Sequence, residues 1–143
     1  MLAICPNDNK LYIYEGCNNP NFSSWQLMHV LEEHDLVISG ISWSPVTNKI
    51  VTCSHDRNAF VWTFDASSRK WIPTLCALML DRAALDVQWC PNGTKFAVGS
   101  GSKTVAVSRL DSSQGSDWYV SKLIKKHKSS VSIFETFNHA VDT

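Results

Sequence analysis

The chain has 143 residues, in which 13 lysines and arginines balance 13 aspartates and glutamates. This length suits one domain with a real apolar core, and the absence of net charge excludes a global electrostatic field that would draw the protein to nucleic acid or an anionic membrane. Six tryptophans, six phenylalanines and three tyrosines are many for this length, and large aromatic side chains favour β-strands.

Targeting and redox features point to a cytoplasmic protein. The longest dense apolar run, Leu75 to Leu80, is too short to cross a bilayer. The first residues, MLAICPNDNK, lack the basic and hydrophobic segments of a signal peptide. Five scattered cysteines with no CxxC spacing indicate reduced thiols, not a disulfide framework or a zinc site. We therefore expect a cytoplasmic chain that binds no metal and no other cofactor.

A repeat of about 46 residues runs along the chain. The tryptophans that open WQLMHVL, WIPTLCAL and WYVSKLI, at positions 25, 71 and 118, are 46 and then 47 residues apart. ISWSP at 41–45 recurs as VQWCP at 87–91, and IVTCSHDRNAFVW at 50–62 aligns with FAVGSGSKTVAVS at 96–108. Upstream, LAICPNDNKLYIY at 2–14 aligns with 50–62 at an offset of 48. Because several independent landmarks agree on one period, the repeat is real.

Each repeat unit is expected to contain four short strands. In the best-marked unit, ISGISW at 38–43 alternates apolar and polar residues, as a half-buried strand does. A turn follows at Pro45 and Asn48, and strands are then predicted at 49–54, 59–64 and 71–78. Four strands per repeat, with little helix signal, predict an all-β fold of β-propeller blades. The blade landmarks lie near 2–31, 34–79 and 80–124, so 1–130 forms the propeller part and 131–143 a divergent tail.

The unit from 34 to 79 resembles the WD-repeat pattern, which has a histidine before the first strand, an aspartate in a tight turn and a tryptophan ending the third strand. Those roles fall on His34, Asp56 and Trp62, with Thr52 or Ser54 as the hydroxyl between them. The resemblance implies a buried polar relay in which every donor has a partner. The matching positions of the next unit hold Leu80, Ser102 and Ser108, so that unit lacks the relay.

The succession AICPN, HVLEEHDLVISGISWSP and NKIVTCSHDRNAFVW is similar to the WD-repeat subunit of the actin-related protein 2/3 complex. KWIPTL, DRAALDVQWCPNGTKFAVGSGS and DWYVSKLIKK continue the likeness to about residue 132. RNAFVW and NGTKFAVGSGS carry most of its specificity. The resemblance implies a seven-bladed propeller, of which this length supplies about three four-stranded blades. It also implies an earlier strand preceding Leu2, and a later strand ending in Trp and Pro where this chain has SIFETFNHAVDT.

Cys53, His55 and Asp56 are candidates for a nucleophilic site. Adjacent side chains on an extended segment diverge, however, so His55 and Asp56 cannot readily orient one another. We expect Asp56 to be structural and His55 to be an exposed turn residue. The five histidines show no metal-ligand spacing. GSGS at 99–102 is flanked by predicted strands, whereas a phosphate loop leads into a helix.

KLIKKHKSS at 122–130 is the local basic run. A solvated loop between blades is the simpler interpretation, and contact with an acidic protein surface is the functional alternative. The residues available for that contact are Lys122, Lys125, Lys126 and Lys128.

The resemblance implies a non-enzymatic scaffold that contributes to nucleation of branched actin filaments in the actin cytoskeleton. Its partners would be the actin-related proteins, the other subunits of the complex and actin filaments, with no nucleic acid, membrane or cofactor. The alternative is a WD-repeat adaptor in another multiprotein complex, in ubiquitin ligation or trafficking, which would share the strand pattern but not RNAFVW and NGTKFAVGSGS. An enzyme is the least favoured hypothesis.

Overall fold

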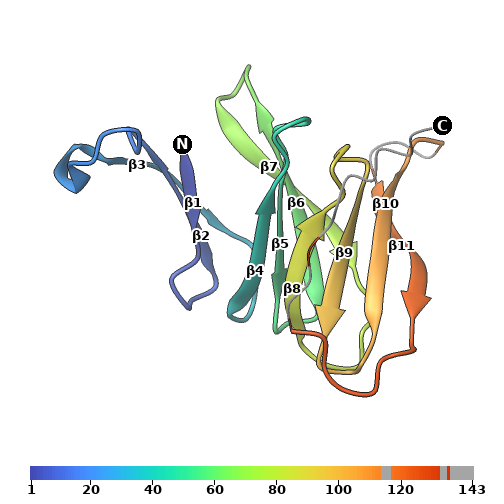
Figure 1. Ribbon diagram of the computed structural model, residues 1–143. Helices are drawn as coiled ribbons and strands as arrows, with labels where there is room; N and C mark the ends of the chain where they lie inside the picture. Colours follow the sequence, from blue (N-terminus) through green and yellow to red (C-terminus); the bar gives the residue numbers. More distant parts are fainter. Residues whose placement is uncertain (114–116, 133–134, 136–143) are drawn as a thin grey trace, which may run out of the picture.

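A computed structural model describes residues 1–113, 117–132 and 135 as three antiparallel sheets standing side by side (Figure 1). The first sheet has the order β1-β2-β3, the second β4-β5-β6-β7, and the third β11-β10-β9-β8. The strands are β1 (Leu2–Ile4), β2 (Lys10–Glu15), β3 (Gln26–Glu32), β4 (Ile38–Trp43), β5 (Ile50–Ser54), β6 (Asn58–Asp65), β7 (Lys70–Ala77), β8 (Ala84–Trp89), β9 (Lys95–Ser100), β10 (Val105–Asp111) and β11 (Asp117–Ile124).

The prediction of an all-β fold is confirmed. In the described residues the one helical segment is a single 3₁₀ turn, η1 (Phe22–Ser24). Each sheet is a meander of consecutive antiparallel strands, which is the construction of a propeller blade. The four strands predicted from 38 to 78 match β4 to β7 to within a residue or two at each end.

The first sheet differs from the expected four-stranded blade because it has three strands. The repeat offset of 48 aligns β1 with β5 and β2 with β6, so the counterpart of β4 would fall ahead of Met1. Of the tail predicted at 131–143, positions 133–134 and 136–143 lie outside the described residues.

The second sheet is covered on both faces. One face packs on the first sheet through Leu11 and Ile13 against Trp62 and Trp71. The other packs on the third sheet through a cluster that includes Val51, Val61, Trp89, Phe96 and Trp118. Every residue of β5 is therefore buried, which explains why its sequence, IVTCS, does not simply alternate apolar and polar residues.

β4, an edge strand of the second sheet, and β8, an edge strand of the third, approach each other closely at Gly40. A β-carbon at this position would lie 2.8 Å from the backbone nitrogen of Val87 and 3.0 Å from Cα of Asp86. Beside it, Ser42 Oγ accepts a hydrogen bond from the Trp89 amide at 3.1 Å, and the Trp89 indole N–H donates to the Ser42 carbonyl oxygen at 3.1 Å. Glycine at 40 thus permits a direct contact between neighbouring sheets that a larger residue would obstruct.

Candidate functional site

His34, Thr52, Asp56 and Trp62 converge from separate elements of the second sheet. His34 lies in the connection before β4, Thr52 in the middle of β5, Asp56 in the turn after β5, and Trp62 on β6. Nδ1 of His34 lies 2.8 Å from Oδ2 of Asp56, and Nε2 lies 2.9 Å from Oγ1 of Thr52. The Trp62 indole N–H donates to the same hydroxyl at 3.0 Å. These contacts form one continuous chain of hydrogen bonds, which we call the polar relay.

Chemistry sets the direction of the relay. An indole N–H can only donate and a carboxylate can only accept. Trp62 therefore donates to Thr52, Thr52 donates to Nε2 of His34, and Nδ1–H of His34 donates to Asp56. This arrangement requires neutral histidine with its proton on Nδ1. A second proton on Nε2 would leave the Thr52 hydroxyl receiving two donors, with its own hydrogen displaced.

The His34 side chain is buried, and its pKa is lowered from its ordinary value of 6.5 because burial disfavours the charged ring. The nearby carboxylate of Asp56 acts in the opposite direction but does not overcome the loss of solvation. The neutral form that the relay requires is therefore also the form that the surroundings favour.

The Asp56 carboxylate also holds the turn that joins β5 to β6. Its Oδ1 accepts from the Asn58 amide at 2.9 Å, and its Oδ2 accepts from the Asp35 amide at 3.1 Å. Arg57, between Asp56 and β6, has a φ of 71°, in the left-handed region that most side chains avoid. These hydrogen bonds help hold that conformation, as side-chain-to-backbone bonds commonly do in turns.

Ser54, the other candidate hydroxyl, does not contact the histidine ring in this arrangement. Its Oγ donates to the Leu36 carbonyl at 2.9 Å and accepts from the Asp56 amide at 3.1 Å. Ser54 thus ties the turn to the segment before β4. Thr52 is the residue that joins His34 to Trp62.

The third sheet holds its corresponding turn differently. Leu80 is buried where the second sheet has His34, and the Ser100 and Ser102 hydroxyls lie 2.7 Å apart. Ser100 also donates to the Thr104 carbonyl at 2.9 Å. Ser108, the counterpart of Trp62, accepts from the Cys76 thiol at 3.4 Å. In this sheet, two separate sets of contacts thus take the place of the relay, one within the turn and one from Cys76 on β7 of the second sheet.

Cys53, His55 and Asp56 do not form a nucleophilic site. Cys53 is fully buried, and burial raises its pKa to about 12, so the sulfur remains a weakly nucleophilic thiol near neutral pH. The His55 side chain is exposed, and Asp56 is bonded to His34 instead. In the GSGS segment at 99–102, Gly99 and Ser100 end β9, and Gly101 and Ser102 begin the turn to β10.

Lys122 lies on β11, and Lys125, Lys126 and Lys128 follow this strand, all with exposed side chains. β11 is the outer strand of the third sheet, and the segment that follows it lies at the lower end of that sheet (Figure 1), apart in sequence from the relay. These lysines are accessible to a partner. Within the described chain, no complementary group lies beside them.

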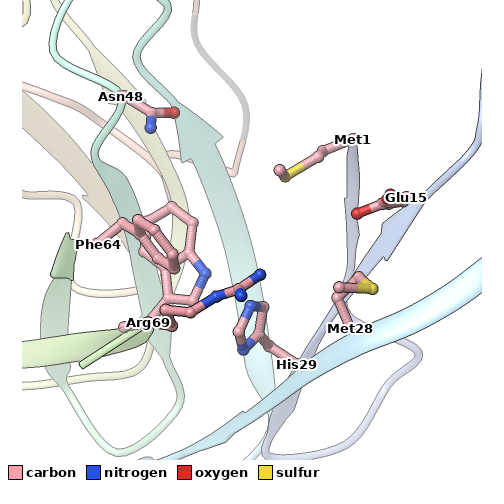
Figure 2. A pocket seen from close by; sticks show the side chains of 8 residues that line it. Met1, Glu15, Met28, His29, Asn48, Phe64 and Arg69 are labelled. Atoms are coloured by element: carbon pink, nitrogen blue, oxygen red, sulfur yellow. The ribbon is translucent and has the colours of Figure 1, made fainter. Parts of the chain in front are cut away.

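A cavity of about 370 Å³ lies between the first and second sheets. Figure 2 shows Met1, Glu15, Met28 and His29 on one side of it and Asn48, Phe64 and Arg69 on the other. Trp71 completes the lining. No sequence motif marks this cavity, because its wall joins segments that share none. Met1, Met28, Phe64 and Trp71 supply its apolar lining, and Glu15, His29, Asn48 and Arg69 its polar groups.

Among the described residues, no three histidine, cysteine, aspartate or glutamate side chains are grouped closely enough to hold a metal ion. In the same part of the chain, no helix has the length and hydrophobicity needed to cross a membrane.

The family model "WD domain, G-beta repeat" matches residues 25–63. This segment begins at the end of η1, includes β3, β4 and β5, and ends within β6. The sequence repeat is therefore offset from the sheets, since it contributes the outer strand of the first sheet and three strands of the second. The relay residues His34, Thr52, Asp56 and Trp62 all fall inside the matched segment.

Three relatives illustrate what the chain is similar to. It is 50% identical over 132 residues, 92% of this chain, to actin-related protein 2/3 complex subunit 1A of Arabidopsis thaliana, and covers 33% of that protein. It is 44% identical over 125 residues, 87% of this chain, to subunit 1A-B of Xenopus laevis, and covers 32% of it. It is less similar to protein transport protein sec13 of Emericella nidulans, at 32% identity over 105 residues, 71% of this chain and 33% of that protein.

The chain spans about a third of the length of these relatives. The identity to the actin-related complex subunits extends over nearly all of the chain, well beyond the single matched repeat. The resemblance inferred from the sequence is therefore confirmed: the chain contains a WD repeat at 25–63 and is similar, over most of its length, to about a third of subunit 1 of the actin-related protein 2/3 complex.

Proposed function

We propose that the chain is a non-enzymatic scaffold that acts as a WD-repeat component of an actin-related protein 2/3 complex. The observation that carries this proposal is the match to subunit 1 of that complex along almost the whole chain. The cytoplasmic actin cytoskeleton would be its location. Its partners would be the actin-related proteins, the other subunits and actin filaments, with no nucleic acid and no membrane.

In this proposal, residues 1–130 supply propeller blades near 2–31, 34–79 and 80–124, and 131–143 is a tail of divergent sequence. The three sheets, at 2–32, 38–77 and 84–124, support this division. The contribution to branched actin nucleation would be mechanical. The chain would hold bound subunits at fixed relative positions, and no step would need a nucleotide or other cofactor.

A positioning role requires a rigid body, and the second sheet has the construction for one. Its two faces are packed on neighbouring sheets, and the polar relay ties the segment before β4 to β5, β6 and their turn. We propose that His34, Thr52, Asp56 and Trp62, with Ser54 supporting the turn, serve this structural purpose and no catalytic one. Satisfied buried networks of this kind favour one arrangement over alternatives.

We further propose that Lys122, Lys125, Lys126 and Lys128 contact an acidic surface of a partner subunit. Their exposure and like charge support this. Reversing Lys125 and Lys126 to glutamate should reduce recovery of the complex with a tagged chain. The matched control reverses Lys70, exposed at the start of β7, and Lys103, exposed in the turn between β9 and β10. Equal recovery from both double variants would exclude the basic run as a contact.

Quantitative co-purification tests the function as a whole. The full chain is tagged and expressed in cells, and its bound proteins are identified by mass spectrometry against an unrelated tagged propeller. Recovery of actin-related proteins in stoichiometric amounts would support the proposal. The likeness to sec13 favours one alternative, an adaptor in protein transport, and enrichment of transport-coat components instead would establish it. Recovery of neither set would contradict the scaffold role in both complexes.

A further inference from the structure

The segment 125–130, which follows β11, carries basic and hydroxyl side chains next to one another. It reads KKHKSS, it lies outside the strands, and all of its side chains are exposed. Lys128 directly precedes Ser129, and Lys126 and Lys125 lie three and four positions before that serine. The proposed partner contact uses the lysines of this segment but gives its two serines no role.

Ser129 is the more accessible of the two serines. A hydroxyl that enters the active site of another enzyme must lie on an exposed segment with few ties to the rest of the fold. Ser130 has such ties, since its Oγ donates a long hydrogen bond of 3.5 Å to the Gly101 carbonyl oxygen and the next amide, of Val131, donates to the Ser100 carbonyl oxygen at 3.0 Å. Within the part of the chain that the structure describes, the Ser129 hydroxyl makes no hydrogen bond.

The charges around Ser129 define a class of modifying enzyme. Protein kinases select their substrates through the pattern of charges around the acceptor hydroxyl, and a basic pattern pairs with an acidic surface of the enzyme. Three lysines lie within the four residues before Ser129, and the sequence has no aspartate or glutamate between Asp117 and Glu135. This pattern suits a serine/threonine kinase that prefers basic residues ahead of the acceptor.

The serine pair in the turn between β6 and β7 is exposed as well but has the opposite electrostatic setting. Oγ of Ser67 donates to the Asp65 carboxylate at 2.8 Å, and Oγ of Ser68 donates to it at 2.6 Å. A phosphate on either serine would lie against a negative charge, and the repulsion would oppose it. Exposure alone therefore does not make a serine of this chain a suitable acceptor.

The surroundings of Ser129 would instead stabilise a phosphate. Gly101, which Ser130 contacts, lies beside Arg82, because a β-carbon on this glycine would be 3.6 Å from Cβ of Arg82. The Arg82 side chain is exposed, so a guanidinium adds to the neighbouring lysines at this end of the sheet. Phosphate oxygens accept charge-assisted hydrogen bonds from such groups.

From this arrangement we propose that Ser129 is a phosphorylation site for a basic-directed serine/threonine kinase, and that its phosphate weakens the lysine contact with an acidic partner. In the reaction, Oγ of Ser129 forms a bond to the γ-phosphorus of ATP, the bond from this phosphorus to the β-phosphate breaks, and ADP leaves. The hydroxyl proton passes to the catalytic aspartate of the kinase.

The consequence for binding follows from charge. A phosphoserine carries a charge of about −1.5 to −2 near neutral pH, which offsets about half of the positive charge of the four lysines at 122, 125, 126 and 128. The attraction to an acidic surface should fall accordingly. This second part rests on the proposed function of the lysines, whereas the acceptor site does not.

The first test maps the acceptor on the purified full chain. The chain is incubated with ATP, Mg²⁺ and either cyclic-AMP-dependent protein kinase or protein kinase C, two basic-directed enzymes, and phosphopeptides are located by mass spectrometry. Ser129→Ala should lose most of the incorporated phosphate, whereas the controls Ser130→Ala and Ser68→Ala should retain it. If neither enzyme modified Ser129, or if Ser129→Ala incorporated as much phosphate as wild type, the acceptor site would be refuted.

The second test measures the change in attraction to acidic groups, with immobilised polyglutamate as the probe. The phosphorylated chain and Ser129→Glu should elute at a lower salt concentration than the unmodified chain, and Ser129→Ala should elute with the unmodified chain. The double reversal of Lys125 and Lys126 to glutamate sets the elution expected when the basic run is lost. Unchanged elution after phosphorylation would overturn the proposed weakening.

Co-purification from cells then separates this proposal from the proposed function. Ser129→Glu should recover less of the actin-related proteins than wild type, and Ser129→Ala should recover the same amount. Equal recovery by wild type and Ser129→Glu would contradict the regulatory effect alone. Recovery of no complex by the wild-type chain would contradict the proposed function, and phosphate mapping would still decide whether Ser129 is an acceptor.

Discussion

Nε2 of His34 lies 2.9 Å from Oγ1 of Thr52, and both atoms are buried in the second sheet. This single contact connects the carboxylate end of the relay, at Asp56, to its indole end, at Trp62. Because Thr52 must donate to His34 while it accepts from Trp62, the hydroxyl cannot be replaced by a methyl group without leaving two buried polar groups without a partner. The free energy of unfolding should therefore depend on this contact.

Thr52→Val should lower the free energy of unfolding by about 1–3 kcal/mol. The substitution preserves shape but leaves the Trp62 N–H and the His34 Nε2 without their hydrogen-bond partner. The expected loss is the free-energy cost of leaving buried polar groups without a partner. Urea denaturation followed by tryptophan fluorescence measures it. Thr63→Val, at an exposed position of β6, is the control and should change stability by no more than about 0.5 kcal/mol. Equal effects at the two sites would show that the relay contributes no stability.

Stability should fall as the pH is lowered below about 6.5. The pKa of His34 is lowered in the folded chain relative to its ordinary value of 6.5, so below that pH the unfolded chain binds a proton that the folded chain refuses. The contribution of neutral His34 to the free energy of unfolding is therefore fully present above the pKa of this residue in the unfolded chain. It is lost as the pH falls toward the lower pKa of the folded chain. Denaturation midpoints measured between pH 7.5 and 5 test this sign.

Two histidine variants separate this effect from other titrations. His34→Gln removes the titrating ring and should flatten the pH dependence, although it also lowers stability at every pH. His55→Gln removes an exposed ring in the adjacent turn and should leave the slope unchanged. A slope that survives the first substitution would assign the pH dependence to other groups.

Gly40→Ala should destabilise the chain by about 1–3 kcal/mol, the usual cost of overpacking. The added methyl group would lie 2.8 Å from the Val87 nitrogen and 3.0 Å from Cys53 Sγ, so β4 and β8 would have to separate. Gly101→Ala is a suitable comparison, because its nearest neighbour is Cβ of Arg82 at 3.6 Å. Thermal denaturation of both variants checks this. A Gly101 variant as unstable as the Gly40 variant would point to loss of glycine itself and not to the close approach.

Cysteine reactivity should differ strongly along the chain. Burial raises the pKa of Cys53 to about 12. Burial also acts against ionisation at Cys90, but hydrogen bonds from Thr94 Oγ and from the amides of Lys95, Thr94 and Gly93 outweigh it and lower the pKa. Alkylation by iodoacetamide at pH 8, followed by mass spectrometry, should modify Cys90 well before Cys53, since the thiolate is the nucleophile. Faster modification of Cys53 would mean that the sheets separate readily.

The strands of the second sheet and the members of its relay were predictable from the sequence. Tryptophans 46 and 47 residues apart revealed the repeat, and turn residues such as Pro45 and Asn48 marked the strand ends. Asp56 and Trp62 stood out because, together with His34, they match the WD-repeat pattern, in which an aspartate lies in a tight turn and a tryptophan ends the third strand. Sequence did not distinguish Thr52 from Ser54, because both are hydroxyl residues on β5 and the choice depends on which one meets His34 in three dimensions.

The sequence by itself determined the period, the all-β class and the family likeness, because local alternation and repeated landmarks suffice for these. Tertiary structure alone decided how the sheets meet. The approach of β4 to β8 at Gly40, the bonds between Ser42 and Trp89, and the cavity beside Arg69 each join residues that no shared motif connects.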